Sequence, residues 1–591
     1  MKISLKWFKD YIDFGISKEE LSKRLTLSGR EVEKEETIGN DTTFEFEITP
    51  NRPDCLSLLG IARELSAILN KPLKKPTVKK VKFPKNKCDV TVTDAQDCPR
   101  YIGAVLKNVH VAASAPWLKE KIISIGARSV NNIVDLTNFC LMETGQPMHA
   151  FDLDKLAGGK IIVRRAKQGE KILAINDVEY TLDPSILVIA DEKKPVAIAG
   201  IMGGKQTEVT EKTKNILLES AYFNPMVIRR ASRKLALRSD SSYRFERGVD
   251  MKMVEGASGR AINLIVKEAK AEPFSFRDVY KGRRTAGKSM PIVVDAEKIS
   301  NFLGTDIPLA KIKNILTKLE FKTSSGPKGK LKVLPPSFRL DIKSDVDVIE
   351  EIARILGYDR LLTRLVAVNP LNIETDPKRI FKEKLAGVLV GQGLNEVICY
   401  SMVGAKDLAA SKVAGQGVVY NQNPLSEEQE IMRPSCAPSM LNVTAHNFKN
   451  GQKDLRLFEI GKIYLPSGEK DVVSIILTGK APHDWRQPQA RAYDFYDSKG
   501  IVERIFEALK IEALSFTPVS NPSLEKDESV SIVFKGKEIG FLGRVEKEIL
   551  EKWDIKHQNV FIAQFFIEAL RDDQKNRVAR YAPLGEYPGV V

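Results

Sequence analysis

Hydrophobic and polar residues follow two patterns along this chain, one that alternates as in a strand and one that repeats as in a helix. Residues 44–50, FEFEITP, alternate, and residues 51–69 read as a loop that enters an amphipathic helix. Ser17 and Glu20 have the spacing of a capping box ahead of apolar residues, which predicts a helix start. We therefore expect a first small α+β domain over residues 1–76.

Three further blocks follow. Short β-type runs with helical stretches between them predict a mixed α/β domain with a central sheet over residues 88–280. Residues 288–363 begin with a strand, contain a helix around 309–321 and end in an apolar-periodic helix at 345–358. Residues 375–580 combine a long helix with strands that predict a large antiparallel sheet. The pattern as a whole is typical of a multidomain α+β protein.

Composition narrows the class of protein. The chain has 92 Lys and Arg against 77 Asp and Glu, a formal charge of +15. This charge would attract a polyanion such as nucleic acid, or would only keep the protein soluble. The six cysteines form no CxxC pair and the five histidines lack zinc-ligand spacing. With neither a signal-peptide pattern nor an apolar run of about 18 residues, we expect a cytoplasmic protein.

Acidic side chains gather at the start of the helix expected at 345–358. They are Asp341, Asp347, Glu350 and Glu351. Offsets of three and four place the last three on neighbouring positions of one helix face. Such a group could hold a hard cation such as Mg²⁺ through oxygen. Alternatively, the acids only complement the helix dipole, with Ser344 as the N-cap and Glu350 paired with Arg354.

A second constellation lies in the 88–280 block, in the segments 134–152, 199–204, 216–223 and 238–248. Gly200, Gly203 and Gly204 have no side chains, so the backbone there can approach a ligand closely. His149 is one of only five histidines. Alternatively, the glycines form a tight hairpin and His149 is a hydrogen-bonded structural residue.

The last of these segments overlaps a strongly basic run. Its cations are Arg229, Arg230, Arg233, Lys234, Arg238, Arg244 and Arg247. One interpretation is phosphate binding. The other is a solvated face with internal pairing, for example to Asp240 and Glu246.

These segments together resemble the β-subunit family of bacterial-type phenylalanine–tRNA ligases, and the likeness runs over nearly the whole chain. Residues 1–76, with ITPNRPDCLSLLGIARELSAI as the most specific stretch, are similar to the family's B1 domain. Residues 88–280 are similar to its B3/B4 editing domain, 288–363 to its B5 domain, and 375–580 to its catalytic-like class II synthetase core.

Two departures from the family pattern stand out. An OB-fold tRNA-binding domain usually divides the B1 domain, but here the two halves meet around Gly39 to Asp41, which leaves no room for it. Residues 581–591 resemble the start of a C-terminal ferredoxin-like anticodon-binding domain and then stop. We therefore expect the natural protein to continue beyond Val591.

The resemblance implies an editing site that hydrolyses mischarged Tyr-tRNA(Phe), lined by Thr137, His149, Gly203 and Glu219. A pocket that selects phenylalanine rejects a molecule with one added hydroxyl by a factor only on the order of 10², so a second, hydrolytic site is needed. Glu219 would accept the phenolic hydrogen bond that phenylalanine cannot make. His149, Thr137 and backbone N–H groups near Gly203 are candidates to position water and stabilise the oxyanion, and none is expected to be a nucleophile.

The same resemblance assigns Gly200, Gly204 and Ser241 to the substrate pocket. Ser241 stands where the family usually has alanine, and its hydroxyl could alter selectivity. Asp341, Asp347, Glu350 and Glu351 would bind magnesium shared with the α subunit.

The implied assembly is an α₂β₂ heterotetramer that charges tRNA(Phe), with ATP consumed at a synthetic site on α. Arg456 and Glu459 resemble a class II motif, but the chain has no GxGxxG or GxxxxGK[ST] phosphate loop, so its last domain is expected to be structural. The leading interpretation is an editing and bracing subunit. The alternatives are a non-editing scaffold and a stand-alone Tyr-tRNA deacylase.

Overall fold

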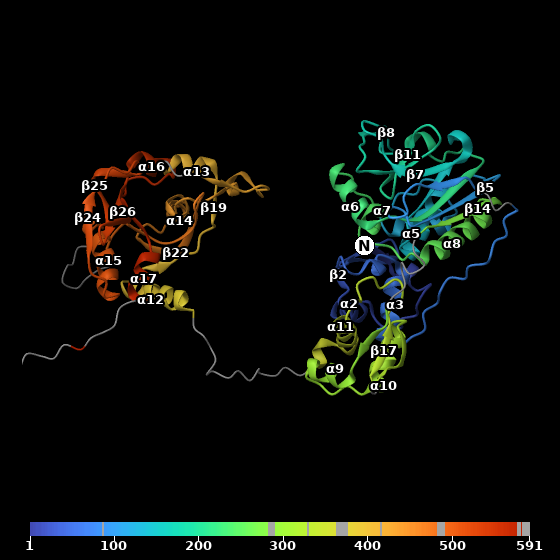
Figure 1. Cartoon of the computed structure of the whole chain (residues 1–591), viewed down its shortest axis with the longest axis horizontal. Coiled ribbons are helices and arrows are strands. Elements are labelled where there is room, and N and C mark those ends of the chain that lie inside the picture. The colour runs from blue at the N-terminus through green and yellow to red at the C-terminus, as the bar shows by residue number, and fades with distance from the viewer. Residues whose placement is uncertain are drawn as a thin grey trace, which may run out of the picture. The chain divides into compact units, whose positions relative to one another are not determined.

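The computed structural model describes residues 1–84, 88–281, 290–327, 330–361, 376–413, 417–481, 491–575 and 581. The chain forms two compact units, residues 1–366 and 367–591, which are considered separately (Figure 1). In the described parts, no helix is long and apolar enough to cross a membrane. The expected start of a further domain at 581–591 lies outside these parts apart from Tyr581.

The first domain is a three-stranded sheet with helices. Its strands, in spatial order, are β1 (Lys2–Ser4), β3 (Asp41–Glu47) and β2 (Glu31–Ile38). The helix start expected at Ser17 is confirmed, because its side chain accepts a hydrogen bond from the Glu20 backbone N–H at the head of α2 (Lys18–Leu27). The strands β2 and β3 pair as a hairpin from Ile38 and Asp41 onward, and Gly39 in the turn has a φ of 60°. Helix α3 (Leu58–Leu69) follows.

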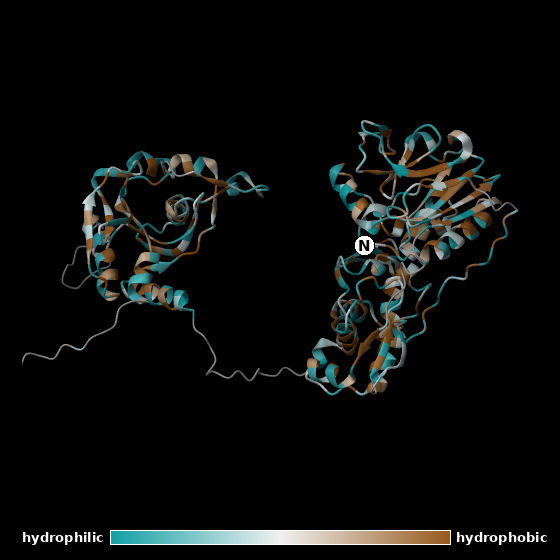
Figure 2. Cartoon of the chain, viewed as in Figure 1, coloured by the Kyte–Doolittle hydropathy of each residue, from teal (hydrophilic) through white to brown (hydrophobic). Residues whose placement is uncertain are grey.

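The 88–280 domain contains two principal sheets rather than the one central sheet expected. The five-stranded sheet has the order β12 (Met202–Gly203), β11 (Pro195–Ile198), β10 (Leu187–Ala190), β7 (Ile161–Arg165) and β4 (Val90–Val92). The four-stranded sheet has the order β14 (Glu272–Tyr280), β5 (Arg100–Lys107), β13 (Ile216–Tyr222) and β6 (Met148–Asp152). Figure 2 shows hydrophobic residues along these strands.

Alternation within β5 and β13 explains the layering. Successive strand side chains point to opposite faces, and here both faces are buried. Ala104 and Leu218 belong to one hydrophobic core, which also contains the helices α4 (Pro116–Ser124), α5 (Asn132–Thr144) and α8 (Met253–Glu268). Tyr101 and Leu217 belong to the other, which the five-stranded sheet covers. The apolar runs of these strands predicted burial but not a second sheet, because the sequence does not specify what covers each face.

The first domain shares the helical core of the second. The indole of Trp7 stacks on Phe139 of α5 with ring centroids 4.9 Å apart. Helix α5 itself begins at Asn131, whose side chain accepts bonds from two backbone N–H groups, and ends at Gly145, which has a φ of 79°. Both ends of the helix that carries Thr137 are therefore defined locally.

The third domain pairs three strands with three helices around its own core. The strands are β15 (Ile292–Val294), β17 (Leu331–Leu334) and β16 (Lys322–Ser325), and the helices are α9 (Ala296–Leu303), α10 (Leu309–Lys318) and α11 (Asp345–Leu356). The two expected helices are confirmed. Gly357, with a φ of 99°, follows the last residue of α11 and ends the helix.

The second unit is built on a seven-stranded sheet. Its order is β18 (Asn395–Glu396), β22 (Leu455–Leu465), β23 (Gly468–Thr478), β27 (Val560–Phe566), β26 (Lys537–Val545), β25 (Leu524–Phe534) and β24 (Leu514–Pro518). Every pairing is antiparallel except that of β18 with β22. Helices α12 (Pro377–Gly391) and α15 (Phe495–Ala508) cover one face and α14 (Ala437–Lys449) the other. The expected antiparallel sheet is thus confirmed.

Candidate functional site

A cavity of about 360 Å³, called here the central pocket, lies among β6, β11, β12, β13 and α5. The predicted site residues that line it are Thr137, His149, Gly200, Gly203, Glu219 and Ser241. Gly204 does not line it. A Cβ on Gly204 would lie 2.6 Å from the Val196 carbonyl oxygen, and its N–H donates to that oxygen over 2.8 Å. The glycine there serves the close packing of β11, not the cavity.

His149 and Glu219 lie directly opposite each other on the paired strands β6 and β13. Residues opposite in an antiparallel pair project to the same face, so both side chains reach the pocket. The imidazole packs against the backbone of Gly203, where a Cβ would be only 2.5 Å from His149 Cε1. A glycine is therefore required at 203 for the ring to occupy this position.

Burial determines the charge of His149. It lowers the pKa of the imidazole to about 4, so the ring is neutral at neutral pH. Its Nε2 atom is buried and has no hydrogen-bond partner in the described parts of the chain. The ring also stands edge-on to Phe151, with centroids 4.6 Å apart. A neutral, fixed imidazole with an unpaired nitrogen can hold one water molecule or one polar ligand atom.

Glu219 is a buried carboxyl group with one hydrogen bond to a described residue. Burial raises its pKa to about 8, while the hydroxyl of Tyr101, which donates to Oε2 over 2.8 Å, acts in the opposite direction. At pH 7 the group is therefore mainly protonated. The sequence analysis assigned Glu219 only as a hydrogen-bond acceptor, whereas a protonated carboxyl group can both donate and accept a hydrogen bond.

Tyr101 was missed at the sequence level. It stands in an apolar strand, where a tyrosine looks like an ordinary packing residue. Gly103 is opposite Glu219 in the register of β5 and β13, so Tyr101 is its diagonal neighbour on the same face, within reach of an aromatic side chain. The available signal was Glu219 itself, because an acid inside an apolar strand needs a buried partner.

Two hydroxyl residues also line the pocket, whose other polar lining residues are Asn138, Glu208, Ser239 and Asp240. Thr137 donates its hydroxyl hydrogen to the Val134 carbonyl over 2.7 Å, so only its oxygen lone pairs remain for a ligand. Ser241 is half-buried on α7 (Asp240–Phe245). The N-cap of that helix, Ser239, donates a hydrogen bond to the Ile201 carbonyl over 2.7 Å. This bond connects α7 to the turn between β11 and β12, which contains Gly200.

The rest of the lining is largely apolar, which sequence analysis did not anticipate in detail. Its larger members are Val134, Leu141, Met148, Ile189, Ile198, Ile201, Met202, Val209 and Phe245. An apolar cavity with a few convergent polar groups is the usual form of a small-ligand site. Gly200 keeps Phe245 and Phe223 in place, since a Cβ there would lie within about 3 Å of both rings.

The four predicted magnesium ligands, unlike the pocket residues, do not all share the same surroundings. Arg339 binds Asp341 through two bonds of 2.9 and 2.8 Å and also binds Glu351. Asp347 accepts from the backbone N–H groups of Lys343 and Ser344 at the head of α11. Glu350 is exposed. The pairing of Glu350 with Arg354, part of the alternative interpretation, is not observed, because Arg354 bonds instead to Glu351 and to Glu64 of α3.

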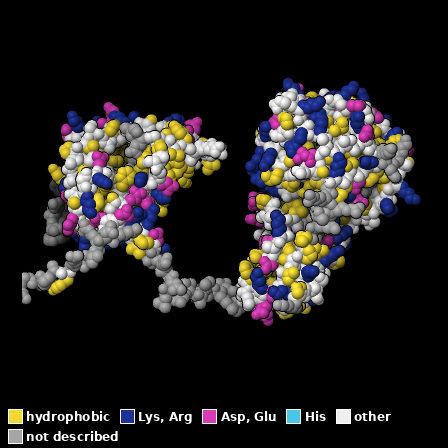
Figure 3. Space-filling model, in the orientation of Figure 1, with side chains coloured by type: hydrophobic (Ala, Val, Ile, Leu, Met, Phe, Trp, Pro, Cys, Tyr) yellow, Lys and Arg dark blue, Asp and Glu magenta, His cyan; other side chains and the backbone are white. Residues whose placement is uncertain are grey.

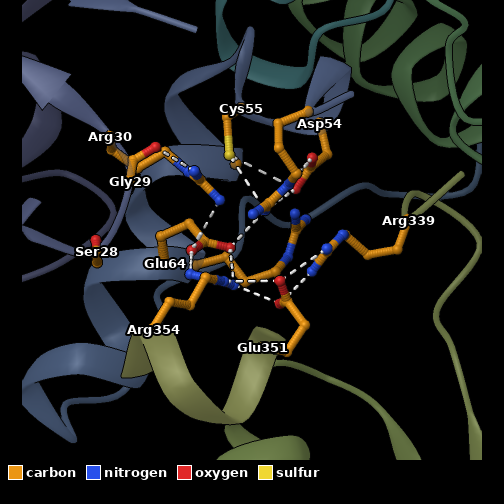
Figure 4. Close-up of polar contacts among 12 residues, drawn as sticks. Ser28, Gly29, Arg30, Asp54, Cys55, Glu64, Arg339, Glu351 and Arg354 are labelled. Carbon is orange, nitrogen blue, oxygen red and sulfur yellow. Dashed lines mark hydrogen bonds and ion pairs between the residues drawn. The ribbon is translucent and has the colours of Figure 1, made fainter. Parts of the chain in front are cut away.

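Asp341 and Glu351 thus belong to a buried ionic group, called here the arginine–carboxylate cluster. Its members are Arg30, Arg52, Asp54, Glu64, Arg339, Asp341, Glu351 and Arg354, several of which are shown in Figure 4. Burial opposes ionisation of Glu64, but Arg354 and Arg52 outweigh it and lower the pKa of that carboxyl. The members comprise four carboxylates and four guanidinium groups, so their formal charges balance.

The same region contains Asp54, Cys55 and Glu64, whose ligand atoms lie within 4.8 Å of one another. Arg52 bonds to all three of these side chains. The geometry is that of a charge-balanced connection between α3 and α11, and the residues present do not fit a cation.

In the second unit, Arg456 and Glu459 do not pair with each other. Glu459 accepts two bonds from the buried Arg433, at 2.7 and 3.0 Å, and Arg456 reaches the Gln392 carbonyl. Residues three apart on a strand face opposite sides, which explains why β22 separates them.

Comparisons with known proteins agree with this architecture. The B3/4 domain family matches residues 97–270, the tRNA synthetase B5 domain family matches 292–358, and the phenylalanyl tRNA synthetase beta chain CLM domain family matches 363–567. The phenylalanine–tRNA ligase beta subunit of Syntrophus aciditrophicus is 37% identical over 573 residues, covering 93% of this chain and 70% of the relative. That of Thermotoga maritima is 36% identical, with 93% and 69% covered.

Among solved structures, an N-terminal fragment of the phenylalanyl-tRNA synthetase beta subunit from Pyrococcus horikoshii aligns with 61% of this chain and 99% of its own, at 17% identity and a TM-score of 0.35. The matched domains define the class of protein, a subunit of an aminoacyl-tRNA ligase. The chain belongs to the phenylalanine–tRNA ligase beta-subunit family. The resemblance noted from its motifs is thereby confirmed.

Proposed function

We propose that the central pocket hydrolyses the ester of mischarged Tyr-tRNA(Phe). The observation that carries this proposal is the position of His149 directly opposite Glu219 on the paired strands β6 and β13. Both residues line an apolar cavity of about 360 Å³, and the absence of a side chain at Gly203 leaves space for the imidazole ring. The phenol of the tyrosyl group would reach Glu219. Phenylalanine would leave that buried carboxyl without the added hydrogen bond, which disfavours its binding.

Hydrolysis adds water to the carbonyl carbon of the ester. The bond from that carbon to the ribose oxygen breaks, and the ribose oxygen takes a proton. We assign the positioning of this water to the imidazole of His149, which lines the pocket and whose Nε2 has no hydrogen-bond partner among the described residues. A pKa of about 4 makes the ring a weak base, so its contribution is to orient the water rather than to remove its proton fully. Thr137 also lines the pocket, and its Oγ1 keeps lone pairs that can accept a hydrogen bond.

The test is deacylation of Tyr-tRNA(Phe) by the complex of the full chain with its α subunit, with Phe-tRNA(Phe) as control substrate. Glu219→Ala should reduce tyrosine release by about 10- to 100-fold, on the scale of a lost specific hydrogen bond in a buried pocket. Glu211→Ala, at an exposed carboxylate that does not line the pocket, is the control and should leave tyrosine release unchanged. Equal spontaneous rates in all samples, with normal charging, would leave the chain a non-editing scaffold.

Assembly with an α subunit, in an α₂β₂ tetramer that uses ATP and Mg²⁺ to charge tRNA(Phe), is part of the proposal. Large apolar side chains of the second unit support a partner surface, since Ile398, Tyr400, Tyr420 and Leu425 are exposed by 64% or more. Figure 3 shows hydrophobic side chains gathered near β19 (Met402–Val403). Gel filtration with and without co-expressed α distinguishes this assembly from a stand-alone deacylase, which would elute unchanged.

Magnesium binding by Asp341, Asp347, Glu350 and Glu351 stays a prediction. The contacts of Arg339 disfavour it, because a cation would have to displace that guanidinium from both Asp341 and Glu351.

A further inference from the structure

A second cavity, of about 620 Å³, lies beside the central pocket and is called here the arginine groove. Helix α6 (Pro225–Lys234) supplies Arg229 and Arg233, which are four residues apart and therefore share a helix face. Arg238 follows the helix, and Arg247 and Tyr243 come from the α7 region. Figure 3 shows Lys and Arg side chains gathered where Figure 1 places α6.

The cations of this basic run divide into two groups. Arg244 pairs with Asp240 at 2.9 Å, Arg247 with Glu246 at 2.7 Å and Lys234 with Asp183 at 2.5 Å. The other four are Arg229, Arg230, Arg233 and Arg238, all exposed and without an ion pair to any described acid. Internal pairing, one of the two interpretations of the sequence, therefore accounts for only part of the run.

Three of the unpaired arginines face one cavity. Arg229, Arg233 and Arg238 line the groove, whereas Arg230, on the same helix, does not. Arginine binds phosphate through two parallel N–H donors, which makes a cluster of free guanidinium groups suited to a phosphodiester backbone. Two carboxylates also line the groove, Asp240 and Glu246, but they pair with Arg244 and Arg247. Arg229, Arg233 and Arg238 have no ion pair of their own among the described residues and repel one another, so an anionic ligand between them is favourable.

The groove adjoins the central pocket. Ser239 and Asp240 line both cavities. The ring of Tyr243, which is 39% exposed, carries the guanidinium of Arg247 on one face, 3.5 Å from the ring centroid. Aromatic rings and guanidinium planes are the surfaces on which unstacked RNA bases lie.

We infer that the arginine groove binds the single-stranded 3′ end of the RNA whose terminal aminoacyl ester enters the central pocket. Arg229, Arg233 and Arg238 hold backbone phosphates, and Tyr243 with Arg247 offers a stacking surface for a base. The orientation of the bound RNA, with its 3′ end toward the central pocket, rests on the proposed editing function. The binding itself is independent of any hydrolysis.

The first measurement is binding of a labelled single-stranded RNA of 12 nucleotides to the full chain at several salt concentrations. The double variant Arg229→Gln/Arg233→Gln should raise Kd by about 10-fold or more and reduce the slope of log K against log salt by about 1.4, two phosphate contacts at roughly 0.7 each. Arg230→Gln/Lys119→Gln removes the same charge from exposed positions outside the groove and should change neither. Equal effects of the two variants, or none, would overturn the assignment.

A second measurement separates the groove from the editing proposal. Hydrolysis of Tyr-tRNA(Phe) should show a raised KM in the groove variant, while hydrolysis of the small ester tyrosyl-adenosine should be as fast as in the parent chain. If the parent hydrolyses neither ester but binds RNA through the groove, the editing proposal fails and the groove stands. If the groove variant matches the parent on RNA binding and on both esters, the groove fails and editing stands.

Discussion

The central pocket and the arginine–carboxylate cluster are both buried and both contain acids, but their bonding differs. In the cluster every carboxylate has a guanidinium partner, and Glu64 has three, Arg30, Arg52 and Arg354. In the pocket, Glu219 has one neutral partner and His149 Nε2 has none among the described residues. Pairing of every carboxylate with a guanidinium group favours a structural role, whereas a buried carboxyl group without a charged partner is typical of a ligand site.

The contrast also shows in the pKa values. Burial alone would raise the pKa of Glu64 as it does that of Glu219, but the surrounding arginines reverse the direction for Glu64. The same residue type is thus an anion in one place and mainly a neutral acid in the other at pH 7. Residue identity in the sequence does not distinguish them.

The largest expected effect follows from breaking the cluster. Glu64→Ala leaves Arg30, Arg52 and Arg354 buried without that counter-charge, and should reduce the free energy of unfolding by about 3–5 kcal/mol. Urea unfolding of the full chain measures it. Glu20→Ala removes a carboxylate from an exposed helical pair with Arg24 and should leave the midpoint nearly unchanged. Similar shifts in the two variants would contradict a special role for the buried cluster.

A smaller effect is expected from filling the space beside His149. In Gly203→Ala the new Cβ would overlap the imidazole, whose nearest atom is 2.5 Å away, so the ring must move. Displacement of a positioning group by about 1 Å lowers a rate on the order of 10²-fold, and Tyr-tRNA(Phe) hydrolysis should fall by about that factor. Gly256→Ala on α8, where the nearest atom is at 3.5 Å, is the control. Unchanged hydrolysis in Gly203→Ala would remove His149 from the site.

The smallest effect concerns the protonation of Glu219. As pH rises through about 8, the carboxyl loses its proton and becomes a stronger acceptor for the phenol. The preference for Tyr- over Phe-tRNA(Phe) should therefore increase several-fold between pH 7 and 9. Because the Tyr101 hydrogen bond favours the ionised form, Tyr101→Phe should move this increase to higher pH. A flat ratio in the parent chain, or a downward shift in Tyr101→Phe, would contradict the assignment.

Much of the fold was determined locally. The helix starts at Ser17 and Ser344 were predicted from the sequence. Like the helix ends at Gly145 and Gly357, they depend on neighbours a few residues away. Strands of the second unit were also predicted from the sequence, because the apolar runs there match buried positions on β22, β23 and β27. The pocket residues Thr137, His149, Gly203 and Glu219 were named through motif resemblance.

Tertiary structure alone decided the rest. Arg354 and Glu64 are 290 positions apart in the chain, so no local pattern could predict that Arg354 pairs with Glu64 rather than with the nearby Glu350. The Tyr101–Glu219 bond spans 118 positions, and the division of one expected sheet into two depended on what covers each face of β5. Hydrogen bonds of caps and turns arise between near neighbours, whereas desolvation and ion pairing depend on which distant segments share an interior. The sequence therefore determined where the helices and strands begin and end, and the packed structure determined which of its charges are paired.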